Sequence, residues 1–159
     1  MSKIKTNAMR ILDSNRIEYE IITYENKDGK IDGVSVANKI GRDINMVYKT
    51  LVTQGLSKEY YVFVIPVNEE LDFKKAAKVA SEKSIELINV KDLTKITGYI
   101  RGGCSPIGMK KLYKTFINIT ASEKDKIVVS GGKIGVQLEI NPQELVNLLN
   151  ARYEDIIKN

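Results

Sequence analysis

Tyr60-Tyr61-Val62-Phe63-Val64-Ile65-Pro66-Val67 is a run of eight residues that is apolar almost throughout. Aromatic and β-branched residues favour an extended strand, and a strand without a polar face needs cover on both sides. We therefore predict a central strand over 60–67, with Pro66 near its end and helices packed on the sheet. Gln54-Gly55 followed by Ser57 predicts a turn that joins this strand to another over 46–53 in a hairpin.

Turn residues and helix caps outline further elements on both sides of this hairpin. Strands are predicted over 18–24, 85–90, 115–119, 126–130 and 135–140. A first helix is predicted with Thr6 or Asn7 as its N-cap and a stop at Ser14-Asn15. Further helices are predicted over 34–40, 71–80 and 91–97 and after Asn141-Pro142, with Lys74, Lys75 and Lys78 on the solvent side of the helix over 71–80. Residues 25–33 are expected to form an exposed loop. The alternation predicts an α/β chain: one mixed sheet with helices, in a single domain over 1–159.

Composition limits the classes of partner and compartment. The chain has 159 residues, of which 43% are hydrophobic, and a formal net charge of +5. This charge makes an anionic partner such as RNA reasonable, although many basic proteins bind no nucleic acid. No run of about 20 apolar residues and no leader-like series is present, so we expect no membrane contact. The single cysteine is typical of a reducing cytoplasm.

The chain has no histidine. Its absence excludes the Ser/His and Cys/His pairs by which most hydrolases activate a nucleophile near neutral pH. One cysteine without histidine also offers no plausible zinc ligand set, so we predict neither a metal nor a cofactor. Any chemistry must therefore use other groups.

Lys49 is the first candidate for such a group. On strand alternation it shares a face with Val47, Leu51 and Thr53, so an ammonium group points where its neighbours are apolar. A pocket that opens onto a bound phosphate or carboxylate would satisfy this charge. An edge strand whose lysine reaches water or deters aggregation is the alternative.

Two glycine-rich segments are the second candidates. Residues 97–108 contain four glycines, and 130–133 are Ser-Gly-Gly-Lys. Glycines can expose backbone N–H groups to a phosphate or a developing oxyanion, but structural turns use glycine as well. Neither segment matches the Walker pattern, so nucleotide hydrolysis has no support. Cys104 lies in the first segment, where a small loop-filling role suits it better than that of a nucleophile.

Tyrosine and basic side chains complete the set of candidates. Tyr24 and Tyr48 are either polar pocket residues or ordinary half-buried aromatics. The cations that flank the first glycine segment either meet phosphates or form a solvated face, and they are Arg101, Lys110, Lys111 and Lys114.

Five motifs in one order give the chain a resemblance to a known family. They are Tyr24 in Thr-Tyr-Glu, the string Val47-Tyr48-Lys49-Thr50-Leu51, the helix start at 71–75, the glycine segment 97–108, and Ser130-Gly131-Gly132-Lys133. In order and spacing this set resembles the YbaK/EbsC family, nearly end to end. The resemblance implies the fold of the editing domain of bacterial prolyl-tRNA synthetases, a mixed, partly barrel-like sheet flanked by helices. It also implies hydrolysis of the ester between a wrong amino acid and the tRNA 3′ end.

The resemblance also implies the roles of individual residues. Lys49 matches the family's central functional lysine, and residues 102–106 match its substrate-facing glycine loop. We predict Lys49, Gly102 and Gly103 as catalytic, and the substrate-binding residues as Tyr24, Tyr48, Thr50, Cys104, Ser105, Pro106, Gly131 and Gln137. Many relatives carry Asp at the position of Gln137, and glutamine cannot act as a carboxylate base. This departure bears on which small amino acid the pocket prefers.

The implied substrate is cysteine mischarged onto proline tRNA, with prolyl-tRNA synthetase as the partner. Two alternatives stay open from the sequence. One is a deacylase for alanine or serine on a tRNA, and the other is a non-catalytic module of the same fold that binds tRNA or a synthetase.

Overall fold

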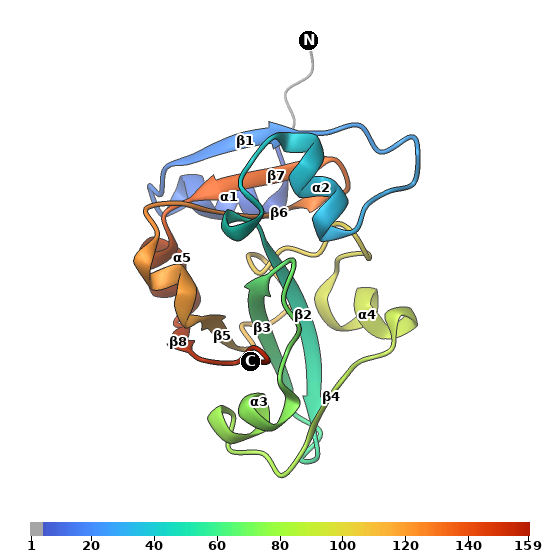
Figure 1. Ribbon diagram of the computed structural model, residues 1–159, viewed down its shortest axis with the longest axis vertical. Coiled ribbons are helices and arrows are strands. Elements are labelled where there is room, and N and C mark those ends of the chain that lie inside the picture. The colour runs from blue at the N-terminus through green and yellow to red at the C-terminus, as the bar shows by residue number, and fades with distance from the viewer. Residues whose placement is uncertain (1–4) are drawn as a thin grey trace.

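The strands of the computed structural model, which describes residues 5–159, form two sheets (Figure 1). One sheet has the order β4-β2-β3-β5-β8, and the other has the order β1-β7-β6. The strands are β1 (Tyr19–Thr23), β2 (Tyr48–Gly55), β3 (Tyr60–Pro66), β4 (Ile85–Leu87), β5 (Lys114–Asn118), β6 (Ile127–Lys133), β7 (Val136–Ile140) and β8 (Arg152–Glu154). The mixed α/β character is confirmed, but hydrogen bonding divides the expected sheet into two, which meet where Val47 bridges Val128.

The apolar run forms the central strand of the five-stranded sheet, as predicted. β3 pairs antiparallel with β2 and parallel with β5. Val62 and Val64 pack into one core with α1 (Asn7–Ser14) and α5 (Pro142–Leu149). Tyr61, Phe63 and Ile65 pack into a second core, beneath α3 (Phe73–Val79). A strand buried on both faces therefore holds the two cores together.

Short polar caps fix where the helices begin. The side chains of Thr6, Asp72 and Asn141 accept hydrogen bonds from backbone N–H groups at the starts of α1, α3 and α5. α2 (Gly33–Ile40) and α4 (Leu93–Thr97) are followed by Gly41 and Gly98, as the sequence predicts. Within the described residues, no helix has the length and apolar character needed to cross a membrane.

Some element boundaries differ from those predicted. The strand expected over 46–53 begins at Tyr48, because Ile44–Met46 forms a 3-10 turn capped by Asp43. The strand expected over 85–90 ends at Leu87, and Val90–Asp92 forms another 3-10 turn. β8 follows the closing helix and was not expected, since three residues are too few to give a pattern.

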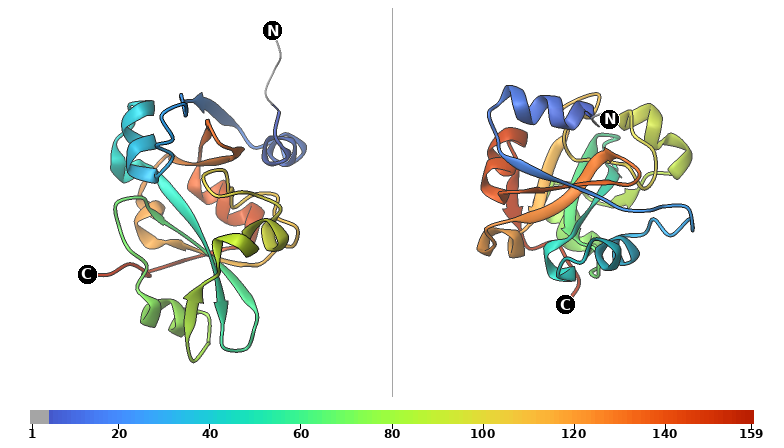
Figure 2. Two further views of the ribbon diagram at one scale, coloured as in Figure 1. Left: turned by 90° about the vertical axis from the view of Figure 1, so that its right-hand side faces the viewer. Right: turned by 90° about the horizontal axis from the view of Figure 1, so that it is seen from above.

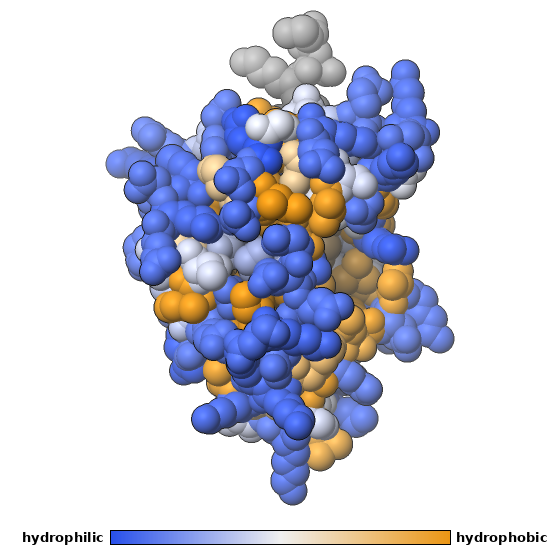
Figure 3. Space-filling model, in the orientation of Figure 1, coloured by the Kyte–Doolittle hydropathy of each residue, from blue (hydrophilic) through white to orange (hydrophobic). Residues whose placement is uncertain are grey.

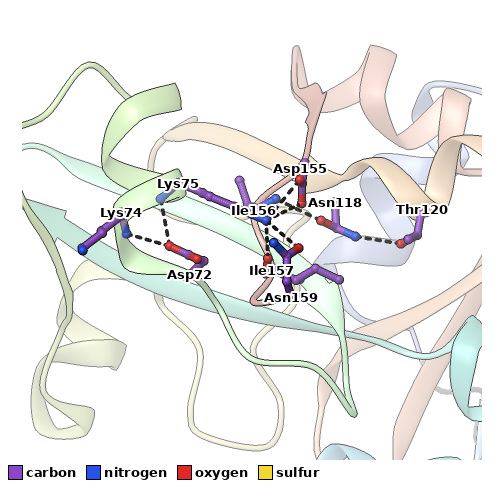
Figure 4. Close-up of polar contacts among 9 residues, drawn as sticks. All are labelled: Asp72, Lys74, Lys75, Asn118, Thr120, Asp155, Ile156, Ile157 and Asn159. Atoms are coloured by element: carbon purple, nitrogen blue, oxygen red, sulfur yellow. Dashed lines mark hydrogen bonds and ion pairs between the residues drawn. The ribbon is translucent and has the colours of Figure 1, made fainter.

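Lys75 is half-buried, although it was expected on the solvent side with Lys74 and Lys78 (Figure 4). Its Nζ donates to Asp155 at 3.1 Å and to the carbonyl oxygen of Ile157 at 2.8 Å. The chain end lies against α3 because Leu71 bridges Ile157. Lys75 therefore ties the C-terminal segment to the second core.

α2, the start of β2, the chain after α4 and the β6–β7 pair come together on one side of the molecule. α2 lies above the start of β2, and the chain between α4 and β5 passes close to both sheets (Figures 1 and 2). Val36 and Ala37 of α2 pack with Val47, Val67 and Val128 in a third, smaller core. This core supports the floor of the cavity described next.

Candidate active site

A cavity of about 200 Å³ lies where the start of β2 approaches β6 and β7. α2 and the glycine loop, which we define as residues 102–108, contribute its other walls. Its lining residues are Ile31, Gly33, Val36, Val47, Tyr48, Lys49, Thr50, Val67, Arg101, Gly102, Cys104, Ser130 and Gln137. Figure 3 shows hydrophobic atoms gathered between α2 and α4 on this face, with hydrophilic residues around them. We call this site the lysine cavity.

Lys49 lies in the wall of this cavity and is half-buried. β2 pairs with β4 only over Thr53–Gly55, so Lys49 lies in the part of β2 that β4 does not cover. The Nζ atom lies 3.4 Å from the carbonyl oxygen of Val67. Burial lowers the pKa of Lys49 from its usual value, against the opposing charges of Glu70 and Glu69. The structure thus favours the pocket interpretation of this lysine over the exposed-edge alternative.

The first half of the glycine loop lines the cavity and needs glycine for steric reasons. Gly102 has a φ of 84°, and a Cβ atom there would lie 2.6 Å from Ile31 Cδ1. A Cβ atom at Gly103 would lie 3.0 Å from the backbone nitrogen of Ile134. The loop therefore packs directly on the chain between β6 and β7.

The backbone N–H groups of this loop are not equivalent. The N–H of Gly103 donates to the carbonyl oxygen of Ile100 at 3.0 Å, so it is not free to bind an oxyanion. The N–H groups of Gly102 and Cys104, which both line the cavity, make no hydrogen bond within residues 5–159. The donors that the loop offers to a ligand are therefore those of Gly102 and Cys104, and Gly103 serves the close packing.

Cys104 lines the cavity, and its thiol is held in an unreactive form. Burial raises the pKa of this thiol to about 11. A thiol with that pKa is almost fully protonated at neutral pH. The loop-filling interpretation of Cys104 agrees with this environment.

Five of the predicted site residues do not line the cavity: Tyr24, Gly103, Ser105, Pro106 and Gly131. The Oγ atom of Ser105 is used inside the loop, where it accepts a hydrogen bond from the N–H of Ile107 at 3.2 Å. Pro106 is buried beside Ile107 on the opposite side of the loop. Gly131 belongs to a bulge in β6, where a Cβ atom would lie 2.8 Å from Val136 Cγ1. Ser105, Pro106 and Gly131 therefore contribute to packing behind the cavity and do not line it.

The hydroxyl groups of three predicted site residues differ in whether they have a hydrogen-bond partner. The hydroxyl of Tyr48 lies 2.7 Å from Thr120 Oγ1 and is thereby occupied. The Oγ1 atom of Thr50 and the hydroxyl of Tyr24 are buried without a hydrogen-bond partner among the described residues. Thr50 lines the cavity, and its hydroxyl is a buried polar group that the described residues leave without a partner. Tyr24 packs with the third core, and Lys39 Nζ lies 5.8 Å from its ring centroid.

Gln137 is 6% exposed and lines the cavity from β7. Its carboxamide makes no hydrogen bond to the described residues, so it faces the cavity as a neutral donor and acceptor. Lys49 and the exposed Arg101 are the cations that line the same cavity. The lining contains no carboxylate, which gives the cavity a positive character.

Sequence reasoning missed several lining residues. Ser130 and Arg101 stood in segments that the sequence singled out, but neither was assigned to the site. Gly33 and Val67 lie against each other in the cavity wall, since a Cβ atom at Gly33 would clash with the Val67 side chain. Apolar and glycine residues from separate segments carry no signal for such a meeting before the fold is known.

Comparison with known proteins places this geometry in a family. The model of the aminoacyl-tRNA editing domain matches residues 32–148, a stretch that includes every lining residue except Ile31. The chain belongs to the aminoacyl-tRNA editing domain family. This finding confirms the resemblance to the YbaK/EbsC proteins that the sequence motifs indicated.

Individual relatives of this editing-domain protein agree with the family assignment. A candidate Cys-tRNA(Pro)/Cys-tRNA(Cys) deacylase, EbsC of Enterococcus faecalis, is 41% identical over 152 residues, which are 96% of this chain and 93% of the relative. The crystal structure of a candidate trans-editing enzyme for prolyl-tRNA synthetase has a TM-score of 0.82 at 17% identity, covering 98% of this chain and 100% of its own. A hypothetical protein of known structure has a TM-score of 0.85 at 19% identity, covering 94% and 97%. At these identities the two structures show the shared fold.

A second cavity, of about 190 Å³, lies on the other side of the glycine loop of this editing-domain protein. It is lined mainly by apolar side chains of α1, α5 and the chain before β5, and we call it the apolar cavity. Its lining residues are Ile11, Pro106, Ile107, Gly108, Met109, Lys111, Leu112, Tyr113, Thr115, Leu148 and Leu149. Among residues 5–159, no group of three His, Cys, Asp or Glu side chains could hold a metal ion.

Proposed function

We propose that this protein is a trans-acting deacylase that hydrolyses the ester joining cysteine to the 3′ end of proline tRNA. The observation that carries the proposal is the half-buried Lys49, which lines a small cavity and forms no ion pair within the described residues. A cation held in such a place needs an anionic or strongly polar ligand. Membership of the editing-domain family and the name of the 41% identical relative support the ester of an aminoacyl-tRNA as that ligand.

The cavity can position the ester but offers no activated protein nucleophile. Lys49 and the free N–H groups of Gly102 and Cys104 supply positive charge and donors where negative charge develops on the carbonyl oxygen. The thiol of Cys104 is protonated because burial raises its pKa to about 11. The chain also has no histidine to take a proton from it. The reactive group must therefore come from the substrate or from water.

The thiol of the bound cysteine is suited to that role. Its sulfur attacks the carbonyl carbon of its own ester, a carbon–sulfur bond forms, and the bond to the 3′ oxygen of the tRNA breaks. The proton of the thiol ends on the tRNA hydroxyl, which leaves. The product is a cyclic thioester that water then hydrolyses to free cysteine. A thiol ionises appreciably near neutral pH and a hydroxyl does not, which favours cysteine over serine as substrate.

The neutral Gln137 supports a second candidate substrate. Without a carboxylate in the cavity, selection of the amino acid depends on size and hydrogen bonding. An alanine or serine ester would then be cleaved by ordered water at a rate similar to that of the cysteine ester. This alternative uses the same lysine and loop.

Prolyl-tRNA synthetase is the proposed partner, in the cytoplasm where tRNA is charged. A chain of 159 residues has little surface with which to distinguish one tRNA body from another. We therefore expect the isolated protein to cleave cysteine from its own tRNA and from proline tRNA at comparable rates. A strong preference for proline tRNA without any synthetase would contradict this division of labour.

A panel of mischarged tRNAs tests the proposed function. Cysteinyl-, seryl-, alanyl- and S-methylcysteinyl-tRNA are compared at saturating enzyme, and only the cysteinyl ester should be cleaved fast. Equal rates for the cysteinyl and S-methylcysteinyl esters would mean that water is the nucleophile. Fastest cleavage of the alanyl or seryl ester would favour the second candidate. Tight tRNA binding with no cleavage of any ester would identify a non-catalytic module.

A further inference from the structure

The excess positive charge of the chain is concentrated in one segment. Residues 87–122 contain six of the 25 Lys and Arg residues and one of the 20 Asp and Glu residues, which leaves 19 of each elsewhere. The whole net charge of +5 therefore lies in this stretch. We call it the basic segment, and its cations are Lys91, Lys95, Arg101, Lys110, Lys111 and Lys114.

These six side chains are exposed and lack acidic partners. All of them are in the exposed class. The ion pairs within residues 5–159 involve other cations, such as Lys39, Arg42 and Lys75, and none involves the basic segment. Cations without neighbouring carboxylates raise the local potential and attract an anionic partner.

The basic segment is held in a fixed shape by its own hydrogen bonds. The N–H of Lys110 donates to the carbonyl oxygen of Thr97 at 3.1 Å, and the hydroxyl of Tyr113 donates to the carbonyl oxygen of Ile96 at 2.7 Å. A Cβ atom at Gly98 would lie 3.5 Å from Cγ of Lys110. Lys110 is therefore placed beside the end of α4, the helix that carries Lys95. Figure 2 shows α4 and the chain after it on one side of the molecule.

The basic segment reaches the lysine cavity at Arg101 and Gly102. Arg101 and Gly102 belong to the basic segment and also line the cavity. Lys110 lies against Gly98, only three positions before Arg101. A nucleic acid whose 3′ end occupies the cavity must continue outward past its rim. Its next phosphates can then meet cations that have no other partner.

We propose that the basic segment binds the phosphate backbone of the tRNA acceptor arm next to its 3′ end, with Lys95 and Lys110 as the central contacts. This proposal rests on the proposed function for the identity of the RNA. Phosphate contacts position a nucleic acid but carry no sequence information. The surface therefore raises affinity for every tRNA alike, and a synthetase remains necessary for choosing proline tRNA.

An acidic protein surface is the rival occupant, and the position of Arg101 in both the basic segment and the cavity lining favours RNA. A matched pair of double variants separates the two. The test variant is Lys95→Gln with Lys110→Gln, which removes two charges from the basic segment. The control is Lys74→Gln with Lys78→Gln, which removes two exposed, unpaired lysines of α3, a helix remote from the lysine cavity (Figure 1).

Two substrates and one binding assay are measured for each variant. The substrates are full-length cysteinyl-tRNA and the cysteine ester of adenosine, which has no phosphate. The binding assay follows uncharged tRNA by fluorescence anisotropy over a range of salt concentrations. The test variant should lose about tenfold in tRNA affinity, and the slope of log K against log salt should fall by about one to two. Its cleavage of the adenosine ester should match that of the wild type.

Each other outcome overturns the proposal in a distinct way. Equal tRNA affinity and salt slope in the test variant and the control would show that the basic segment does not bind RNA. Loss of cleavage on both substrates would show that the lysines support the cavity itself. Unchanged tRNA binding would leave an acidic protein surface as the occupant of the basic segment. If the wild type cleaves neither substrate, the proposed function fails, and the anisotropy assay still decides whether this surface binds RNA.

Discussion

The two cavities on either side of the glycine loop are nearly equal in volume, about 200 Å³ and about 190 Å³, yet they differ in chemistry. The lysine cavity has a half-buried cation, a buried hydroxyl without a partner and two free backbone N–H groups. The apolar cavity is lined largely by leucine, isoleucine, methionine and proline, and the hydroxyl of its Thr115 is already bonded. Volume alone therefore does not identify a reaction site, whereas unsatisfied polar groups do.

The first half of the glycine loop borders the lysine cavity, and the second half borders the apolar cavity. Gly102 and Cys104 line the lysine cavity, and their N–H groups make no hydrogen bond within residues 5–159. Ser105 and Ile107 are fully buried and stabilise the fold. A glycine and a threonine occur in the lining of both cavities, and this gives matched variants. In every pair, only the variant in the lysine cavity should change catalysis.

The largest expected effect is that of Lys49→Ala. Because Lys49 is the half-buried cation of the cavity, its removal should lower kcat/KM for cysteinyl-tRNA by about 100- to 1,000-fold. A half-buried lysine leaves little empty space, so thermal unfolding should change little. Leu148→Ala in the apolar cavity is the control, and its kcat/KM should stay within about twofold of the wild type. Comparable losses in both variants would remove the distinction between the cavities.

The glycine pair should give the next largest difference. Gly102 and Gly108 have φ values of 84° and 81°, so alanine at either position should cost about 1–2 kcal/mol of unfolding free energy. The Cβ atom at position 102 would press on Ile31 in the cavity wall. Gly102→Ala should therefore lose about 10- to 100-fold in kcat/KM, and Gly108→Ala little. Urea unfolding and deacylation rates are measured together. An equal loss of activity in the two would indicate general destabilisation.

The threonine pair distinguishes a free hydroxyl from a structural one. Thr50→Val removes a buried hydroxyl that has no partner in the described structure, so stability should be unchanged or higher, while kcat/KM falls about tenfold. Thr115 Oγ1 donates to the carbonyl oxygen of Tyr113 at 2.9 Å. Thr115→Val should therefore cost about 1 kcal/mol of unfolding free energy and leave catalysis unchanged. Full activity in Thr50→Val would show that this hydroxyl does not contact the substrate.

Much of the fold could be predicted from the sequence, because apolar runs and helix caps lie within short stretches of the chain. The apolar run at 60–67 required a strand buried on both faces, and polar caps such as Asp72 fixed helix starts. The contact of Lys75 with the chain end could not be predicted, since it joins segments about 80 residues apart in sequence. β8 could not be predicted either, because its three residues form a strand only by pairing with β5.

The site was less predictable than the fold. The glycine motif showed that a loop approaches the cavity, but not that the N–H of Gly103 is already bonded to Ile100. The sequence predicted the same substrate-binding role for Cys104 and Ser105. In the structure, Cys104 lines the cavity, whereas Ser105 is fully buried. Which side of a loop each residue faces depends on packing that the sequence does not display.

Cys104 gives the smallest expected effect in this comparison, because it lines the lysine cavity and we propose no catalytic role for it. Burial raises the pKa of its thiol to about 11, so at pH 7 about one molecule in 10,000 carries the thiolate. Cys104→Ala should therefore retain kcat/KM within about twofold. Alkylation of Cys104 by iodoacetamide should be slow at pH 7 and should rise steeply toward pH 11. Loss of deacylation in Cys104→Ala, together with fast alkylation at neutral pH, would instead identify this cysteine as the nucleophile and remove the need for a thiol on the substrate.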